Sequence, residues 1–245
     1  MTAEVDNSRS MVYNSFMNDY KAPELKIIAH AENAFTSSFA VPRQSGLVKN
    51  VTRIVFEPEF CKEGILNGID EFSHLWILWL FSGETGKQWS PTVRPPKLGG
   101  NRRKGVFATR SPLRPNPVGL SSVRLLSVCS SGKTQYLEVE GADLINGTPI
   151  IDVKPYVPYC DCRADASMGF ADGEKHALDV VFSPDAAENL PKDLLRELKD
   201  VLSLDPRPGY QHDENKVYKF EYGNFTLSFS VKESVLTVLS AKKND

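Results

Sequence analysis

The pattern of apolar and polar positions predicts a chain rich in short strands up to about residue 160. Apolar or β-branched runs bounded by turn residues predict strands over 25–31, 51–56, 74–81, 118–127, 135–142 and 150–154. The run HLWILWLF at 74–81 fits a buried strand or a short buried helix, and its length and aromatic content favour a central strand. The runs 118–127 and 135–142 flank a Ser-Ser-Gly-Lys turn and predict an antiparallel pair. Many short strands joined by long loops indicate an all-β barrel or sandwich.

Two segments between these strands are predicted to be loops. Residues 39–46 hold a Pro-Arg-Gln turn. Residues 89–117 contain six prolines, so no helix can run through them, and only 106–109 predicts a strand there. Long ordered loops in compact domains are usually functional, so we expect the chemistry to lie in these two segments.

The pattern changes after about residue 164. A strand is predicted over 177–182, and a helix starts at Pro191 and runs to about Leu204. Its apolar positions recur at helical spacing, at Leu194, Leu195, Leu198, Val201 and Leu202. A breaker at 205–209 and strands near 216–222, 224–231 and 234–240 follow. The predicted organisation is a flexible polar tail over 1–22, a β-rich domain over 23–163 and a small α+β domain over 164–245.

Composition excludes some classes of protein. Hydrophobic residues make up 41% and charged residues 24% of the chain, which is ordinary for a globular protein. No apolar run is long enough for a transmembrane helix and no signal peptide is recognisable, so we expect a cytoplasmic protein with no membrane partner. The cysteines Cys61, Cys129, Cys160 and Cys162 form no C-x-x-C pair and the histidines are scattered, so we expect plain thiols and no metal.

The distribution of charge points to a polyanion. The net charge is −2, yet no Asp or Glu occurs from Lys87 to Leu137, a window with ten lysines and arginines. Such a block is a candidate nucleic-acid surface, and the alternative is a solvated face that lacks acids. The predicted phosphate contacts are Arg94, Lys97, Arg102, Arg103, Lys104 and Arg114. Trp89 and Phe107 could stack on an unpaired base, or could belong to the core.

Motifs of several enzyme classes are absent. No G-x-G-x-x-G follows a strand, and the glycines at 100 and 105 lack the Lys and Ser/Thr of a phosphate loop. Neither G-x-S-x-G nor H-E-x-x-H occurs. The sequence therefore gives little support for a dehydrogenase, a kinase or a hydrolase.

Four ordered blocks are distinctive enough to suggest a family. They are FAVPRQSGLV at 39–48, GIDEFSHLWIL at 68–78, the pair PTVRPPKLGGN at 91–101 and GVFATRSPLRPNPVG at 105–119, and DLINGTPIIDVKPYVP at 143–158. In these blocks the chain resembles the TsaA-like family, whose members include the TrmO-type tRNA methyltransferases. The resemblance covers about 25–160 and extends to Asp205-Pro206-Arg207-Pro208-Gly209-Tyr210.

The resemblance implies a mainly β fold, with a single-sheet, barrel-like, cofactor-binding main domain and a small C-terminal α+β domain. It implies a homodimer that uses S-adenosylmethionine to methylate N6 of threonylcarbamoyladenosine at position 37 of threonine tRNA. By resemblance the cofactor contacts fall on Arg43, Gln44, Ser45, Gly83, Glu84, Arg110, Leu120, Ile145, Asn146, Gly147 and Thr148. Many family members carry Asp where this chain has Asn146, which would keep an acceptor for a ribose hydroxyl but lose a charge.

Candidate catalytic residues follow from geometry. Asp152, Lys154 and Tyr156 alternate along a predicted strand and so share a face, where they could handle the proton of the reacting nitrogen. An internal Asp152–Lys154 ion pair is the alternative. Asn116, held between two prolines, offers both a donor and an acceptor.

The remaining aromatic and histidine positions of the apolar run are assigned to structure. His74 is predicted to be a core histidine, and Trp76, Trp79 and Phe81 are predicted to be core residues.

Two other classes of function stay open. One is a non-catalytic RNA- or nucleotide-binding barrel, which would keep the basic block but need no cofactor. The other is an interaction protein that acts through its C-terminal unit. The two rigid small-ligand loops, RSPLRPNP and NGT, favour the enzyme, because a pure RNA binder does not need them.

Overall fold

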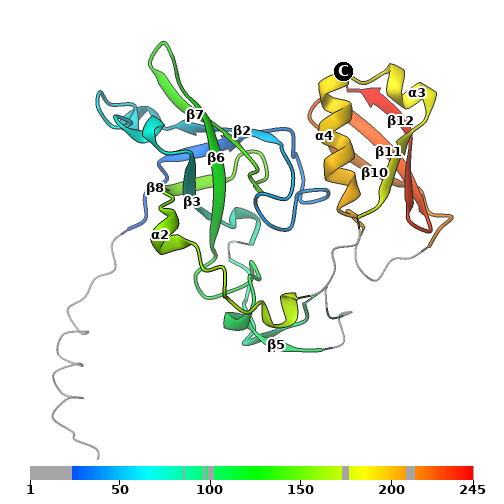
Figure 1. Ribbon diagram of the computed structural model, residues 1–245, viewed down its shortest axis with the longest axis horizontal. Helices are drawn as coiled ribbons and strands as arrows, with labels where there is room; N and C mark the ends of the chain where they lie inside the picture. The colour runs from blue at the N-terminus through cyan, green and yellow to red at the C-terminus, as the bar shows by residue number, and fades with distance from the viewer. Residues whose placement is uncertain are drawn as a thin grey trace, which may run out of the picture.

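The protein folds into a closed β-barrel followed by a smaller α+β domain (Figure 1). The computed structural model describes residues 24–84, 86–95, 98, 102–172, 177–207 and 213–244. The barrel strands are β1 (Ala29–Glu32), β2 (Val51–Phe56), β3 (His74–Leu80), β6 (Val118–Ser131), β7 (Thr134–Glu140) and β8 (Pro149–Pro155). They close in the order β1-β2-β7-β6-β3-β8, so the predicted mainly β, barrel-like main domain is confirmed.

The strand predicted over 74–81 is confirmed as β3, which pairs with β6 and β8 and buries alternate residues. Leu75, Ile77 and Trp79 point into the barrel core. Trp76 lies on the other face and is only half-buried, so its assignment to the core is wrong. Phe81, just after the strand, packs against the core as predicted. His74 is exposed at the first position of the strand, so its prediction as a core histidine is wrong as well.

The proline-rich segment forms short pieces of structure. It contains a small hairpin of β4 (Thr92–Val93) and β5 (Lys104–Gly105) and a 3-10 turn, η5 (Val106–Ala108). The strand predicted over 106–109 is therefore wrong. The Thr109 backbone N–H and hydroxyl both donate to the Val106 carbonyl, at 3.1 and 2.8 Å, and these local bonds close a turn in place of a ladder.

Other short turns lie along the chain. They are η1 (Pro58–Phe60), η2 (Ile69–Glu71), η3 (Ser82–Glu84), α2 (Pro158–Asp161) and η6 (Gly169–Ala171).

The C-terminal domain is a four-stranded sheet with two helices. Its strands β9 (Asp179–Phe182), β10 (Tyr218–Tyr222), β11 (Phe225–Lys232) and β12 (Val235–Lys243) lie in the order β10-β11-β12-β9. Strand β9 pairs parallel with β12. Helix α3 (Pro184–Glu188) precedes α4 (Lys192–Ser203), which begins after Pro191 as predicted and buries Leu198, Val201 and Leu202.

The loop between β1 and β2, residues 33–50, joins the two domains and is called the β1–β2 loop below. Its residues Phe35, Ala40 and Val48 are buried in the core of the C-terminal domain. The Phe35 ring meets Tyr222 edge-on at 5.1 Å, and the Gly223 N–H donates to the Ala34 carbonyl at 2.7 Å. The predicted division at residues 163 and 164 falls in the segment between β8 and β9, but this loop crosses it in space. The predicted tail, residues 1–22, lies outside the described residues.

Candidate active site

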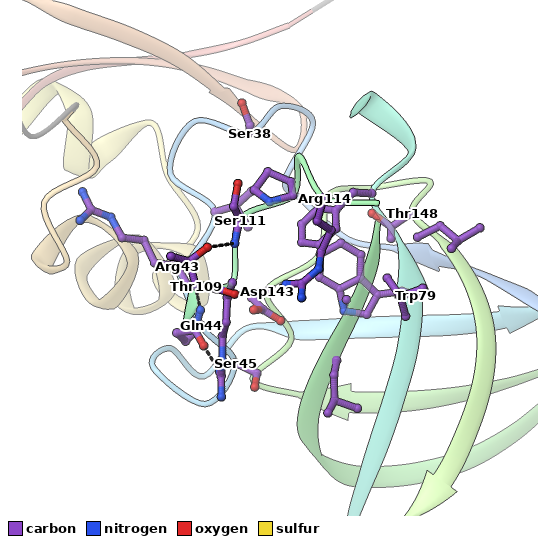
Figure 2. A pocket seen from close by; sticks show the side chains of 18 of the residues that line it. Ser38, Arg43, Gln44, Ser45, Trp79, Thr109, Ser111, Arg114, Asp143 and Thr148 are labelled. Carbon is purple, nitrogen blue, oxygen red and sulfur yellow. Dashed lines mark hydrogen bonds between the residues drawn. The ribbon is translucent and has the colours of Figure 1, made fainter. Parts of the chain in front are cut away.

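A cavity of about 1310 Å³ lies where the β1–β2 loop faces the barrel (Figure 2). Its wall is formed by that loop, by parts of β3 and β6, by residues of the proline-rich segment and by the turn after β7. Segments distant in sequence therefore converge on one concave site. Such a cavity is where a ligand is expected to bind.

Nearly all the residues predicted to contact a cofactor line this cavity. They are Arg43, Gln44, Ser45, Gly83, Arg110, Leu120, Ile145, Asn146 and Thr148. Gly147 connects two lining residues without lining the cavity itself, and the side chain of Glu84 lies outside the described part. Asn116 and two of the predicted RNA contacts, Arg94 and Arg114, also line the cavity. The structure thus brings the FAVPRQSGLV, RSPLRPNP and NGT segments together.

Hydrogen bonds join the β1–β2 loop to the proline-rich segment and to the barrel. The Arg110 guanidinium donates to the Gln44 side-chain carbonyl, and the Gln44 amide donates to the Arg43 carbonyl. The Ser122 backbone N–H donates to the Ser45 hydroxyl at 3.2 Å. Figure 2 shows Gln44 and Ser45 close to Thr109 and Asp143. The loop therefore forms a wall of the cavity that is tied to its neighbours by polar contacts.

The turn after β7 supports the same loop from the barrel. The Asn146 backbone N–H donates to the Phe35 carbonyl at 2.8 Å, and its side-chain oxygen accepts from the Asn33 N–H at 3.1 Å. Gly147 has a φ of 80°, which favours glycine, and its N–H donates to the Ala31 carbonyl at 2.7 Å. The acceptor oxygen of Asn146 thus holds the start of the β1–β2 loop. An Asp at this position could accept the same hydrogen bond.

Asp143 is a lining residue for which sequence reasoning gave no role. It is the only carboxylate among the described residues that line the cavity, which also include Arg43, Arg94, Arg110 and Arg114. Burial raises its pKa, and this rise is opposed by the hydrogen bond from Ser121 and by the positive charge of Arg110. A carboxylate in a cleft whose pKa is perturbed by partial burial is a candidate for a functional group.

A hydrogen-bond chain from the barrel orients that carboxylate. The Trp79 indole N–H donates to the Ser121 hydroxyl at 2.9 Å, and this hydroxyl donates to Asp143 at 2.5 Å. Gly119 makes room for the indole, because a Cβ there would lie 2.2 Å from a Trp79 ring atom. Asp143 is the first residue of the motif DLINGTPIIDVKPYVP, but the residues next to it in the sequence do not indicate that its side chain lies in the cavity.

The predicted catalytic face is not brought to the cavity. The Lys154 amine and the Asp152 carboxylate lie 2.8 Å apart and form the ion pair that was the alternative. Neither residue is among those that line the cavity, and the Tyr156 ring packs against Trp76 at 5.3 Å. The catalytic role of these three residues stays a prediction.

The basic block is spread along the rim and beyond it. Arg102, Arg103 and Lys104 do not line the cavity. The Arg103 guanidinium donates to the Thr92 hydroxyl at 2.8 Å, and the Lys104 amine lies 5.7 Å from the centre of the Phe170 ring. Lys97 lies outside the described residues.

The two aromatic residues singled out in the basic block are both exposed. Trp89 is 45% exposed and Phe107 is 77% exposed, so neither belongs to the core, and Phe107 lines the cavity.

Comparisons with known proteins identify the family. The family model of the tRNA-methyltransferase O N-terminal domain matches residues 30–162, and that of the TrmO C-terminal domain matches residues 175–244. The chain therefore belongs to the tRNA-methyltransferase O family, which confirms the resemblance, and it is a methyltransferase.

Individual relatives agree with this assignment. The chain is 35% identical to the tRNA (adenine(37)-N6)-methyltransferase of Escherichia coli K12, over 91% of this chain and 98% of that protein. It is 39% identical to the putative S-adenosylmethionine-dependent methyltransferase RcsF of Pseudomonas aeruginosa PAO1, over 76% of this chain and 83% of that protein. A crystal structure of TrmO from P. aeruginosa superimposes with a TM-score of 0.73 at 29% identity, over 92% of this chain and 99% of that one.

Among the described residues, no group of three or more His, Cys, Asp or Glu side chains is placed to hold a metal ion. No helix in the same part of the chain has the length and apolar character needed to cross a membrane.

Proposed function

We propose that this protein uses S-adenosylmethionine to methylate N6 of threonylcarbamoyladenosine at position 37 of threonine tRNA. One observation carries the proposal: the predicted cofactor loops and part of the basic block share a single cavity. The volume of about 1310 Å³ exceeds the range of roughly 300–1,000 Å³ typical of a small-molecule site. It leaves room for a cofactor together with a flipped-out base. The names of the E. coli and P. aeruginosa relatives support the target atom and the cofactor.

The cavity offers a partner of opposite charge for both the negative and the positive groups of the cofactor. Arg110 and the Gln44 amide offer donors for the amino-acid carboxylate of the cofactor. The turn from Ile145 to Thr148 offers backbone and side-chain groups for the adenosine moiety. Asp143, as the only described carboxylate in the lining, is placed to balance a positive charge of the cofactor. When bound, the cofactor supplies an electrophilic methyl group on a sulfonium, so correct positioning of the nucleophile contributes much of the rate.

The substrate base is held at the rim. Phe107 presents an exposed ring to an unpaired base, and Arg94 and Arg114 offer cations to the flanking phosphates. Methyl transfer to N6 would break the bond from the methyl carbon to sulfur and release the N6 proton, which solvent water can accept. Asn116 can accept a hydrogen bond from N6–H and so orient the nitrogen.

The test is mass spectrometry of nucleosides from threonine tRNA that bears threonylcarbamoyladenosine, incubated with the protein with and without S-adenosylmethionine. We expect a cofactor-dependent gain of one methyl mass on that nucleoside. The same tRNA without the threonylcarbamoyl group shows whether this group is required. Cofactor binding without methyl transfer would contradict the proposed substrate, and absence of both would favour the RNA-binding barrel.

A matched pair of arginine variants separates the two ligands. Arg110→Gln removes a cation from the cavity, so we expect a higher KM for the cofactor with little change in KM for tRNA. Arg103→Gln removes a cation of the same basic block that lies outside the cavity. For this variant we expect a higher KM for tRNA with little change in KM for the cofactor. Equal effects of both variants on the cofactor KM would contradict the placement of the cofactor.

The homodimer implied by the resemblance and the cytoplasmic location expected from the sequence stay predictions. Sedimentation equilibrium measures the first and cell fractionation the second.

A further inference from the structure

The β1–β2 loop connects the cavity to the C-terminal core. Its middle residues, Arg43 to Ser45, line the cavity. Residues on both sides of them, among them Ala40 and Val48, are buried in the core of the C-terminal domain. A movement of that core away from the loop would therefore change the wall of the cavity.

Phe39, in the β1–β2 loop, contacts two aromatic residues of the C-terminal sheet. Its ring lies 5.6 Å from Phe220 on β10 and 6.2 Å from Phe229 on β11. Both partners are buried, and they lie at the β10 side of the sheet. Helix α3 contacts the opposite side, at β9 and β12. The loop thus supplies part of the cover of the C-terminal core at β10 and β11.

The backbone next to Phe39 is held in a strained conformation. Ala40 has a φ of 68°, in the left-handed region that costs a non-glycine residue roughly 1–2 kcal/mol. Such a conformation persists only where the surrounding structure holds it, and Ala40 is buried in the C-terminal core. Val41, Pro42 and Arg43, which follow it directly, all line the cavity.

We propose that the C-terminal domain is a structural part of the cofactor site and that Phe39 is its positioning residue. The apolar contacts of Phe39 with the C-terminal sheet keep the loop in the shape that presents Arg43, Gln44 and Ser45 to the cofactor. This inference rests on the proposed function, because it takes S-adenosylmethionine as the ligand of the cavity. Without these contacts the loop samples other shapes, and the apparent dissociation constant rises in inverse proportion to the population of the competent shape.

The test compares three single variants of the full chain. Phe39→Ala removes the contact from the loop, and Phe220→Ala removes it from the C-terminal sheet. Leu236→Ala is the matched control, because Leu236 is buried in the same core but lies on β12, next to β9. The Kd of S-adenosylmethionine is measured by isothermal titration calorimetry at a temperature well below the Tm of every variant.

We expect Phe39→Ala and Phe220→Ala each to raise this Kd about tenfold, as when the competent shape falls to about a tenth of the molecules. The double variant should be no weaker than either single variant, because both break the same contact. Leu236→Ala should lower the Tm but leave the Kd at the wild-type value. Kinetics should show a higher KM for the cofactor, with kcat at saturating cofactor and KM for tRNA unchanged.

The outcomes keep this inference and the proposed function apart. Failure of the wild-type protein to bind the cofactor would contradict the proposed function. Wild-type binding with an unchanged Kd in Phe39→Ala would overturn only the inference, and so would an equal rise in Leu236→Ala, which would indicate general loosening. If Phe39→Ala does not fold, Phe39→Leu is measured instead, and we expect a rise of about threefold because much of the apolar contact remains.

Discussion

The barrel and the C-terminal sheet complete their cores in different ways. The buried residues described for the barrel core all come from its own strands and the turn after β7, between Ala29 and Ile150. The C-terminal core includes Phe35, Ala40 and Val48 from the β1–β2 loop. A barrel closes on itself, whereas an open sheet needs cover for the whole of its buried face. The C-terminal domain therefore depends on the β1–β2 loop of the barrel domain for part of its core, and this loop also forms part of the wall of the cavity.

This dependence changes how a deletion would be interpreted. The sequence suggests ending the chain near residue 165 to ask whether the C-terminal unit is dispensable. Such a deletion would leave Phe35 and Val48 without their apolar surroundings. Activity could then be lost because a catalytic element is missing or because the exposed apolar residues destabilise the protein. Point variants separate these two causes.

The largest effect is expected from Gly119→Ala, which breaks the barrel wall of the cavity. The added Cβ would lie 2.2 Å from the Trp79 ring and would displace the indole from the core. We expect a loss of about 2–3 kcal/mol in the free energy of unfolding in urea. Because Trp79 donates to Ser121, cofactor binding should weaken at least about tenfold, which corresponds to 1.4 kcal/mol.

Gly105→Ala is the control for that variant. An added Cβ meets nothing within 4 Å there, so the free energy of unfolding should change by less than about 0.5 kcal/mol. Equal losses in both variants would show that the crowding at Trp79 is not the cause.

A smaller effect is expected from Asp143→Asn, which tests charge without changing shape. S-adenosylmethionine should bind about tenfold more weakly, while S-adenosylhomocysteine, whose sulfur is neutral, should lose less. Calorimetry with both ligands makes the comparison. Equal losses for the two ligands would show that Asp143 does not act on the charge of the sulfur.

The same variant has a predicted dependence on pH. Because burial raises the folded-state pKa of Asp143, its contribution to stability is present at acid pH and is lost as pH rises through that pKa. The variant should therefore unfold within about 1 kcal/mol of the wild type at pH 7. Cofactor affinity of the wild type should fall as Asp143 is protonated, and this fall should disappear in the variant. A parallel fall in the variant would assign it to another group.

The smallest effect is expected from Tyr222→Phe, in the C-terminal core. The Tyr222 hydroxyl donates to Glu197 at 2.6 Å, and the ring contact with Phe35 is kept in the variant. We expect a loss of about 1 kcal/mol in the free energy of unfolding, with cofactor affinity unchanged.

Glu197 gives this prediction a pH signature. Burial raises the pKa of Glu197, opposed by the Tyr222 hydrogen bond. Removal of that bond should raise the pKa further, so the difference in stability between variant and wild type should be largest above it and shrink in acid. A changed cofactor Kd would mean that this polar contact, too, reaches the cavity.

The sequence predicted local structure well where one signal dominated. The apolar run at 74–81 predicted strand β3, and Pro191 together with the helical spacing of the apolar residues after it predicted α4. The strand predicted over 106–109 failed because a β-prone run of this length yields to local hydrogen bonds, here from Thr109. Trp76 was misplaced because a continuous apolar run does not show which alternate residues face the core.

The site was predicted in part for the same kind of reason. The family resemblance predicted Arg43, Gln44 and Arg110 as contacts of one cofactor, and the structure brings all three to one cavity. Asp143 and Gly119 were missed, because their roles depend on the indole of Trp79, which lies elsewhere in the sequence. The role proposed for Phe39 could not be predicted from the sequence, since its partners Phe220 and Phe229 lie in the other domain.

The contact between Phe39 and Phe220 also sets a delay during synthesis. About 180 residues separate the two, and ribosomes add roughly 5–20 residues per second. The loop therefore emerges roughly 10–40 seconds before the strand that covers it. During that interval the barrel strands can already pair, but the apolar side of the loop has no partner. The nascent chain is most exposed to aggregation and to chaperone binding in this window, which ends when β10 and β11 reach the loop.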